Sequence, residues 1–90
     1  MSGHVFHPGH SELHGITVVL ESAEGLYIGR YHEETPQGVL LHDVAEHRES
    51  EGRSDFVRKT LKFGVRAQHP HVVIPSADVR RVTRLVDWQE

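Results

Sequence analysis

The stretch that decides the fold is Gly25-Leu26-Tyr27-Ile28-Gly29-Arg30-Tyr31-His32, followed by Glu33-Glu34-Thr35-Pro36-Gln37-Gly38 and Val39-Leu40-Leu41-His42-Asp43-Val44. Two runs rich in aliphatic, aromatic and β-branched residues flank a short polar segment that holds a proline and a glycine, a pattern typical of a β-hairpin. We therefore predict a long hairpin over residues 24–48. A turn centred near Thr35-Pro36 would place His42 opposite Gly29 and His32 opposite Val39, and none of the hairpin histidines would then have a carboxylate or nucleophile partner.

The segments around the hairpin predict three more strands. Residues 16–20 alternate so that Ile16, Val18 and Leu20 share one face. Residues 71–74 and 79–86 predict a closing pair of strands, separated by a tight turn over residues 75–78 that begins with Pro75.

Two short helical segments are also predicted. Residues 11–14 favour a single turn with Ser11 as its cap. Residues 54–63 favour a short helix that begins with Ser54 as its cap and ends at Gly64. Its expected buried stripe consists of Phe56, Val57, Thr60 and Leu61.

The length of 90 residues predicts one small domain. We expect a flexible, histidine-rich arm over residues 1–10, a single domain over residues 11–86 with an insertion at about 49–70, and a tail over residues 87–90. Five short strands are too few for two well-filled sheets, whereas one strongly bent sheet reduces its exposed edges by curling. The predicted fold class is mainly β: a five-stranded, strongly bent barrel of SH3-like or Sm-like type.

Composition narrows the function classes. The chain has no cysteine, which excludes disulfides and thiolate metal sites. It has nine histidines. Ten Lys and Arg against 13 Asp and Glu give a formal charge of −3. This charge argues against the basic field of a general nucleic-acid binder. No run of 18 apolar residues and no signal peptide are visible. We therefore expect no membrane span and a cytoplasmic or phage (virion)-associated protein.

The order of these elements resembles the Sm-like family of Sm, LSm and Hfq proteins. The resemblance covers residues 11–48 and 71–86, and it rests on the order of the elements and on the apolar positions. It implies a five-stranded, strongly bent sheet that assembles head-to-tail into a ring of five to eight subunits. The strand edges that would meet carry Val72, Val73 and Ile74 on one side and Val82, Thr83 and Leu85 on the other.

The family's RNA-binding residues are not present at the matching positions. The loop that carries an Asp and an Asn in the family is Glu33-Glu34-Thr35-Pro36-Gln37-Gly38 here, and the loop that carries Arg-Gly is Pro75-Ser76-Ala77-Asp78. Acidic side chains at a phosphate position oppose binding. The resemblance therefore implies assembly without family-type uridine binding.

Histidines and basic residues supply the remaining candidate sites. Imidazoles are good ligands for Zn²⁺ or Ni²⁺, and the candidate metal ligands are His4, His7, His10, His14, His69 and His71. His69 and His71 alternate in an extended segment, so both rings could reach one metal. The candidate nucleic-acid or polyanion contacts are Arg58, Lys59, Lys62, Arg80, Arg81 and Arg84.

The sequence shows no nucleophile–base pair, no glycine-rich phosphate loop and no nucleophile elbow. We therefore expect no enzymatic activity and no catalytic residue. The leading prediction is a non-enzymatic, ring-forming Sm-like protein that acts as an oligomeric scaffold or binding module, with itself as partner and no cofactor. Two alternatives stay open: RNA binding through a local basic patch, and histidine-dependent metal binding.

Overall fold

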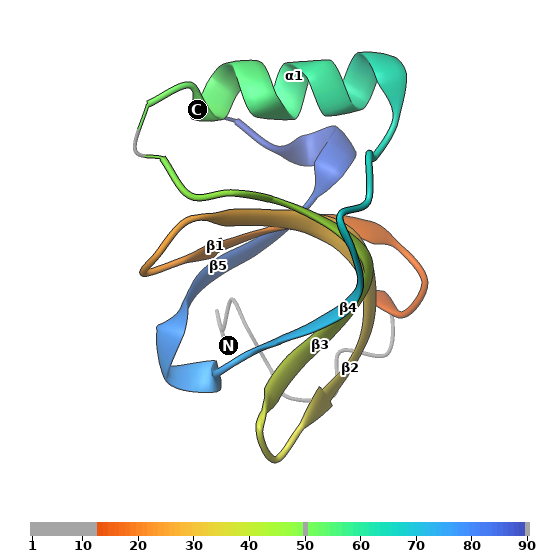
Figure 1. Cartoon of the computed structure of the whole chain (residues 1–90). Coiled ribbons are helices and arrows are strands. Elements are labelled where there is room, and N and C mark those ends of the chain that lie inside the picture. Colours follow the sequence, from red (N-terminus) through yellow and green to blue (C-terminus); the bar gives the residue numbers. More distant parts are fainter. Residues whose placement is uncertain (1–12, 50, 90) are drawn as a thin grey trace.

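A computed structural model describes residues 13–49 and 51–89, in which five antiparallel strands form one open sheet. The strands are β1 (Thr17–Ser22), β2 (Leu26–Thr35), β3 (Gly38–His47), β4 (His69–Ile74) and β5 (Val79–Arg84). Their order in the sheet is β4-β3-β2-β1-β5, so β4 and β5 lie at its two ends. The ribbon curves strongly (Figure 1). The prediction of a mainly β fold with five short strands is confirmed.

The predicted hairpin is the centre of this sheet. Strands β2 and β3 have ten residues each and are joined by Pro36 and Gln37. The Thr35 hydroxyl accepts hydrogen bonds from the backbone N–H groups of Gln37 and Gly38 and donates to the Gly38 carbonyl at 2.9 Å. Gly38 has a φ of 144°, and a Cβ at this position would lie 2.1 Å from the Ile74 carbonyl oxygen. Only glycine therefore lets the hairpin tip approach the end of β4.

Two bulges change the register of the hairpin. Ile28 pairs with Ala45 and Arg30 with His42, so Gly29 faces two residues of β3, and Asp43 there has a φ of 53°. The second irregularity adds His32 to β2 between the positions paired with Leu41 and Leu40. The predicted pairings of His42 with Gly29 and of His32 with Val39 are wrong. The turn is centred on Pro36 and Gln37, later than predicted, and the extra residue His32 shifts the register again, so His42 pairs with Arg30.

The sheet is buried on both faces near its centre. The inner cluster consists of Val18, Leu20, Tyr31, Val39, Leu41, Val44 and Ile74. Val19, Leu26 and Ile28 are fully buried on the other face of the same strands, where Val57 of the helix packs on them. The prediction that Val18 and Leu20 share the core face with Ile16 is confirmed, since Ile16 packs against the inner cluster. The neighbouring Val19 points the opposite way, as strand alternation requires.

The predicted helix is present as α1 (Arg53–Phe63), and Gly64 follows it with a φ of 90° and an N–H bond to the Thr60 carbonyl. The predicted cap is wrong: α1 begins one residue before Ser54, and the N-cap is Gly52, in the left-handed conformation and without a side-chain bond. Leu61 is 49% exposed, so the buried stripe is narrower than predicted. Figure 1 shows α1 lying over one side of the curved sheet, and its Val57 packs in the second cluster and not in the inner one.

The segments after β4 and β5 are short turns. The tight turn predicted at 75–78 contains the 3₁₀ turn η2 (Ser76–Asp78). The last strand ends at Arg84, and Leu85 belongs to the turn η3 (Leu85–Asp87), so the predicted strand over 79–86 is two residues too long. Leu85 and Trp88 pack against the cluster beneath α1. Of the predicted N-terminal turn, Ser11 and Glu12 lie outside the described residues, while Leu13 accepts a bond from the Ile16 N–H at 2.9 Å.

Candidate functional site: two edge strands and a row of histidines

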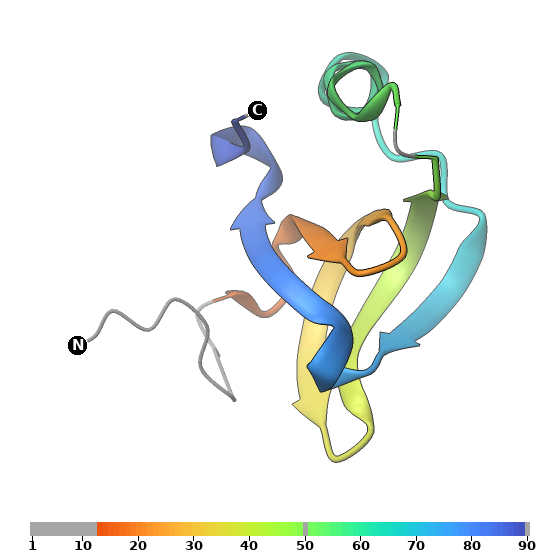
Figure 2. The ribbon, with the colours of Figure 1, turned by 90° about the vertical axis from the view of Figure 1, so that its left-hand side faces the viewer.

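The ends of the sheet are the first candidate site. Within residues 13–49 and 51–89, β4 pairs with β3 alone and β5 pairs with β1 alone. Both edge strands have six residues and are linked by η2. Figure 2 shows that β4 and β5 meet at η2 and diverge away from it. Each edge strand therefore has one side without a strand beside it, and such a side offers backbone donors and acceptors to another chain.

The side chains predicted for this interface differ in what they expose. Val72 and Val82 pack against the inner cluster, and Ile74 is only 3% exposed, so these three contribute to the subunit's own core. Val73 is 42% exposed, which makes it the apolar side chain of β4 that another chain could cover. Thr83 is half-buried opposite Val19, whereas Leu85 lies beyond the strand in η3.

A cavity of about 250 Å³ lies beside the β4 edge. Its walls include Ser22, Tyr27, Val72, Ile74 and Asp78, from β1, β2, β4 and η2. The Ser22 hydroxyl is used locally, because it bonds the Gly25 carbonyl and accepts from the Glu24 and Gly25 N–H groups. The cavity lies between the turn that joins β1 to β2 and the segment that runs from β4 into η2.

Tyr31 is buried and Tyr27 is partly buried near this interior, and the pKa of each is raised. Burial raises the pKa of Tyr31, and the Glu34 carboxylate raises it further. Burial also raises the pKa of Tyr27, with Glu46 as the next cause. The Tyr31 hydroxyl has no hydrogen-bond partner among the described residues. Tyr31 belongs to the inner cluster, and Tyr27 packs against it.

The predicted basic residues divide between α1 and β5. The Arg81 Nε donates to Glu21 Oε2 at 2.7 Å and the Arg84 Nε to Asp87 Oδ2 at 2.7 Å, while Arg58 pairs with Asp55. Lys62 lies 5.4 Å from the centroid of the Phe63 ring. Three of the predicted polyanion contacts therefore already have a carboxylate beside them, which reduces the local positive field.

A wide groove separates α1 from the end of β3. Its volume is about 850 Å³, and its walls include Ala45, Phe56, Lys59, Phe63 and Arg66. The Phe63 ring is 71% exposed. The groove combines apolar surface with two cations, and it forms because the predicted insertion at 49–70 leaves β3, crosses the outer face as α1 and returns to β4.

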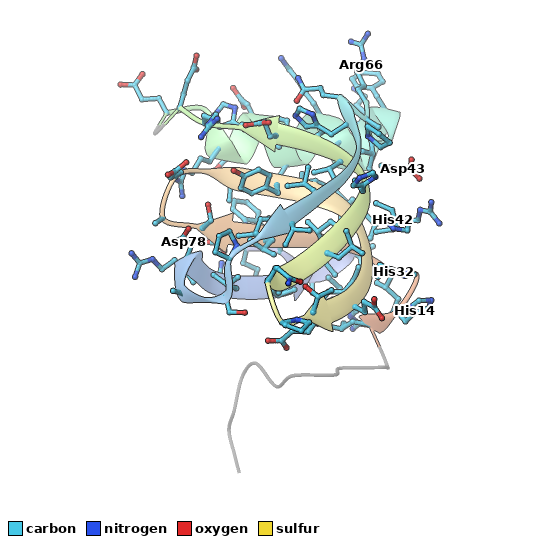
Figure 3. The ribbon with its side chains drawn as sticks, turned by 60° about the horizontal axis from the view of Figure 1, so that its bottom comes forward. His14, His32, His42, Asp43, Arg66 and Asp78 are labelled. Carbon is cyan, nitrogen blue, oxygen red and sulfur yellow. The ribbon has the colours of Figure 1, made fainter. Side chains whose placement is uncertain are left out.

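Four histidines from separate parts of the chain form a row on the outer side of the sheet. The ring centroids of His14 and His32 are 5.0 Å apart, those of His32 and His42 are 4.4 Å apart and stacked, and those of His42 and His71 are 6.5 Å apart. Figure 3 shows the labelled members, His14, His32 and His42, along the outside of the curved strands. We call these four residues the histidine row.

The backbone explains why the row forms. His42 and His71 are direct cross-strand partners of β3 and β4, so their side chains are neighbours on one face. His32 is the extra residue of β2, and the bulge brings its ring onto His42. The His14 Nδ1 lies 2.6 Å from the His32 carbonyl oxygen, which ties the N-terminal turn to β2.

The other histidines have different neighbours. His69 Nε2 lies 2.6 Å from Glu46 Oε1, whereas the His71 ring faces His42, so the predicted pair is divided between two environments. His47 Nε2 lies 2.7 Å from the Glu51 carbonyl oxygen, and its ring stacks on Phe56. His4, His7 and His10 lie outside the described residues.

Sequence reasoning placed His32 and His42 in the hairpin but did not bring them together. The irregularity that brings the two rings together lies at His32 itself, between the paired residues Tyr31 and Glu33, and no glycine or proline marks it in the sequence.

None of the helices in residues 13–49 and 51–89 has the length and apolar character that crossing a membrane requires. The comparisons with known proteins add no family: the sequence matches no family model and no curated protein.

Proposed function

We propose that this protein is a non-enzymatic oligomeric scaffold or binding module of Sm-like type, in which β4 of one subunit pairs with β5 of the next. The observation that carries the proposal is the sheet order β4-β3-β2-β1-β5, which puts two edge strands of equal length at opposite ends of one curved sheet. Pairing them head-to-tail continues the sheet from subunit to subunit, and such a contact either closes into a ring or continues as a filament. The ring of five to eight subunits is what the resemblance to the Sm-like family implies.

The composition of the edge strands supports pairing of β4 with β5 over pairing of β5 with a second copy of β5. Strand β5 holds Arg80, Arg81 and Arg84 in six residues. Two copies of β5 side by side would place these cations near one another, and like charges on facing strands are destabilising. Strand β4 carries no Asp, Glu, Lys or Arg, and it exposes Val73. A β4–β5 contact therefore separates the arginines and covers an apolar side chain.

The size of the subunit supports the same proposal. A domain of 10.2 kDa buries a smaller share of its surface than a larger one does. Assembly is a common way for small domains to gain stability. Covering the Val73 side chain and the edge backbone of β4 provides such a gain, at about 25 cal/mol for each Å² of apolar surface.

Val73→Lys tests the proposal directly, with Val86→Lys as its control. Both valines are exposed, at 42% and 74%, but Val86 lies in η3, outside the edge strands. In sedimentation at micromolar concentration, we expect the wild type and Val86→Lys to run as the same oligomer and Val73→Lys to shift toward 10.2 kDa. An oligomer that survives Val73→Lys and is lost in Val86→Lys would contradict edge pairing.

A further inference from the structure

We propose that the groove between α1 and the end of β3 binds a small amphipathic carboxylate, that is, an apolar chain that ends in one anionic group. The groove is formed within a single subunit, because its walls come from β3, from α1 and from the segment that leads to β4. The inference therefore does not depend on pairing of the edge strands.

The size and the apolar walls of the groove are the first argument. Its volume of about 850 Å³ lies within the range of roughly 300–1,000 Å³ that is typical of small-molecule sites. Along α1 the walls extend from Phe56 to Phe63, about two turns or about 10 Å of helix. Ala45 in the opposite wall is 4% exposed, whereas the Phe63 ring is 71% exposed. An apolar chain in the groove would remove this ring from water, which is favourable.

The cations of the groove are the second argument. Within residues 13–49 and 51–89, its walls include Lys59 and Arg66 but no Asp or Glu. Neither of these two side chains has a hydrogen bond or ion pair with another described residue. Other arginines already have a carboxylate partner, namely Arg30, Arg48, Arg58, Arg81 and Arg84. The groove therefore has two cations available for an anion, although the protein as a whole has a formal charge of −3.

The nearby acidic residues determine the expected orientation of the ligand. A smaller cavity of about 420 Å³ beside the first half of α1 has three acidic residues in its walls: Glu49, Glu51 and Asp55. It shares Phe56 and Lys59 with the groove, whereas Arg66 belongs to the groove alone. An anionic group is repelled by the acidic cavity. We therefore expect the carboxylate at the Arg66 end and the apolar chain against Phe63.

The uncharged polar residues of the walls favour a small ligand over an acidic peptide. The Thr60 hydroxyl donates to the Phe56 carbonyl at 2.9 Å, and Gln68 Oε1 accepts from the Glu46 N–H at 2.9 Å. Both groups are thus used within the chain. A peptide main chain needs a partner for each N–H and C=O that it buries, whereas a hydrocarbon chain needs none. Apolar contact and charge are what the groove offers.

NMR titration of the ¹⁵N-labelled full chain with decanoate tests the proposal. We expect decanoate to bind at one site and to shift the amide signals of Gly64 and Ala67, which lie in the walls. Decyltrimethylammonium has a chain of the same length and a positive head. It should bind about 10-fold more weakly, because the groove has cations and no acid. The net charge of −3 would favour the opposite order elsewhere on the surface.

Two pairs of variants separate charge from apolar contact. Lys59→Met with Arg66→Met should weaken decanoate binding by about 5–10-fold. The control, Arg30→Met with Arg48→Met, changes the net charge equally but lies outside the groove, so its affinity should match the wild type. Phe63→Ala should lose about 10-fold. Its control is Leu61→Ala, because Leu61 is 49% exposed on the same helix but is not in the walls.

The amide spectrum of each variant shows whether it is folded, and the comparison of the two probes on the wild type needs no variant. The competing occupant is an acidic peptide, for which the pentapeptide Asp-Asp-Phe-Asp-Asp is the probe. The proposal is overturned if decyltrimethylammonium binds the wild type as tightly as decanoate does, or if the pentapeptide binds more tightly than decanoate. Wild-type affinity for decanoate in the Lys59→Met, Arg66→Met double variant would also overturn it.

Discussion

The outer side of the sheet has two halves that differ in what covers them. Strand β2 runs through both: Leu26 and Ile28 lie beneath α1 and are fully buried, whereas Arg30 and His32 lie beyond the helix. Strand β3 does the same, with Ala45 in the covered half and His42 in the uncovered half. Gly29 and Asp43 separate the two halves. One end of the hairpin therefore contributes buried side chains that stabilise the fold, and the other end presents polar side chains to solvent.

The largest expected effect comes from a substitution in the covered half. Leu26→Ala removes a fully buried side chain beneath α1 and should lower the free energy of unfolding by about 2–5 kcal/mol, because a cavity is left behind. The comparison variant His32→Ala, in the uncovered half, should cost less than about 1 kcal/mol in metal-free buffer. Urea unfolding measures both. Equal losses in the two variants would show that the halves do not differ in the way we describe.

The second prediction concerns the boundary between the halves. A Cβ on Gly29 would lie 2.9 Å from the His42 carbonyl oxygen and 3.0 Å from a Val44 methyl. Gly29→Ala should therefore push the strands apart at the bulge and destabilise the protein by about 1–3 kcal/mol, as overpacking does. Urea unfolding gives the size of the effect. A Gly29→Ala variant as stable as the wild type would contradict this prediction, because it would show that the strands accommodate the added methyl group without cost.

The third prediction concerns the inner face. Tyr31 is buried and its hydroxyl has no partner among the described residues. Tyr31→Phe should leave stability unchanged or raise it by up to about 1 kcal/mol at neutral pH, because an unpaired buried polar group is removed. The pKa of Tyr31 is raised above 10.0 in the folded state, so the wild type should lose stability as the pH rises past 10. Denaturation at pH 7 and pH 11 tests both; a destabilised variant at pH 7 would reveal a hidden partner of the hydroxyl.

The smallest expected effect is an absence of binding. The hairpin tip carries Glu33 and Glu34, and the turn between β4 and β5 carries Asp78. Oligo-uridine should therefore bind more weakly than about micromolar at physiological salt, since phosphate contacts supply most of the affinity for nucleic acid. Filter binding over a range of salt concentrations measures this. Nanomolar affinity at about 150 mM salt would favour the basic residues of α1 and β5 as an RNA site.

The sequence predicts the elements of this fold better than their register. The alternation around Val18 and the turn residues at Pro36 and Gly64 have local causes, so the strands, the hairpin and the end of α1 are predictable. The bulges are not, because Asp43 in a left-handed conformation depends on how β2 and β3 bend together. The histidine row follows from that register and from a bond that joins His14 to a residue 18 positions away. Its formation is therefore a tertiary effect.

The helix start shows the same limit on a smaller scale. Ser54 is a good N-cap residue by type, yet Gly52 occupies the cap position. The chain must turn sharply between the end of β3 and α1, and a left-handed residue provides that turn. The path of the chain therefore decides which residue is the N-cap here, and the general preference for serine at that position does not.

Native mass spectrometry of the untagged wild type at micromolar concentration, in metal-free buffer, tests the central claim most directly. Edge pairing of β4 with β5 predicts one dominant species of five to eight subunits of 10.2 kDa each. It also predicts that the same species dissociates in the Val73→Lys variant. A wild-type protein that appears only as a 10.2 kDa monomer would contradict the proposed assembly.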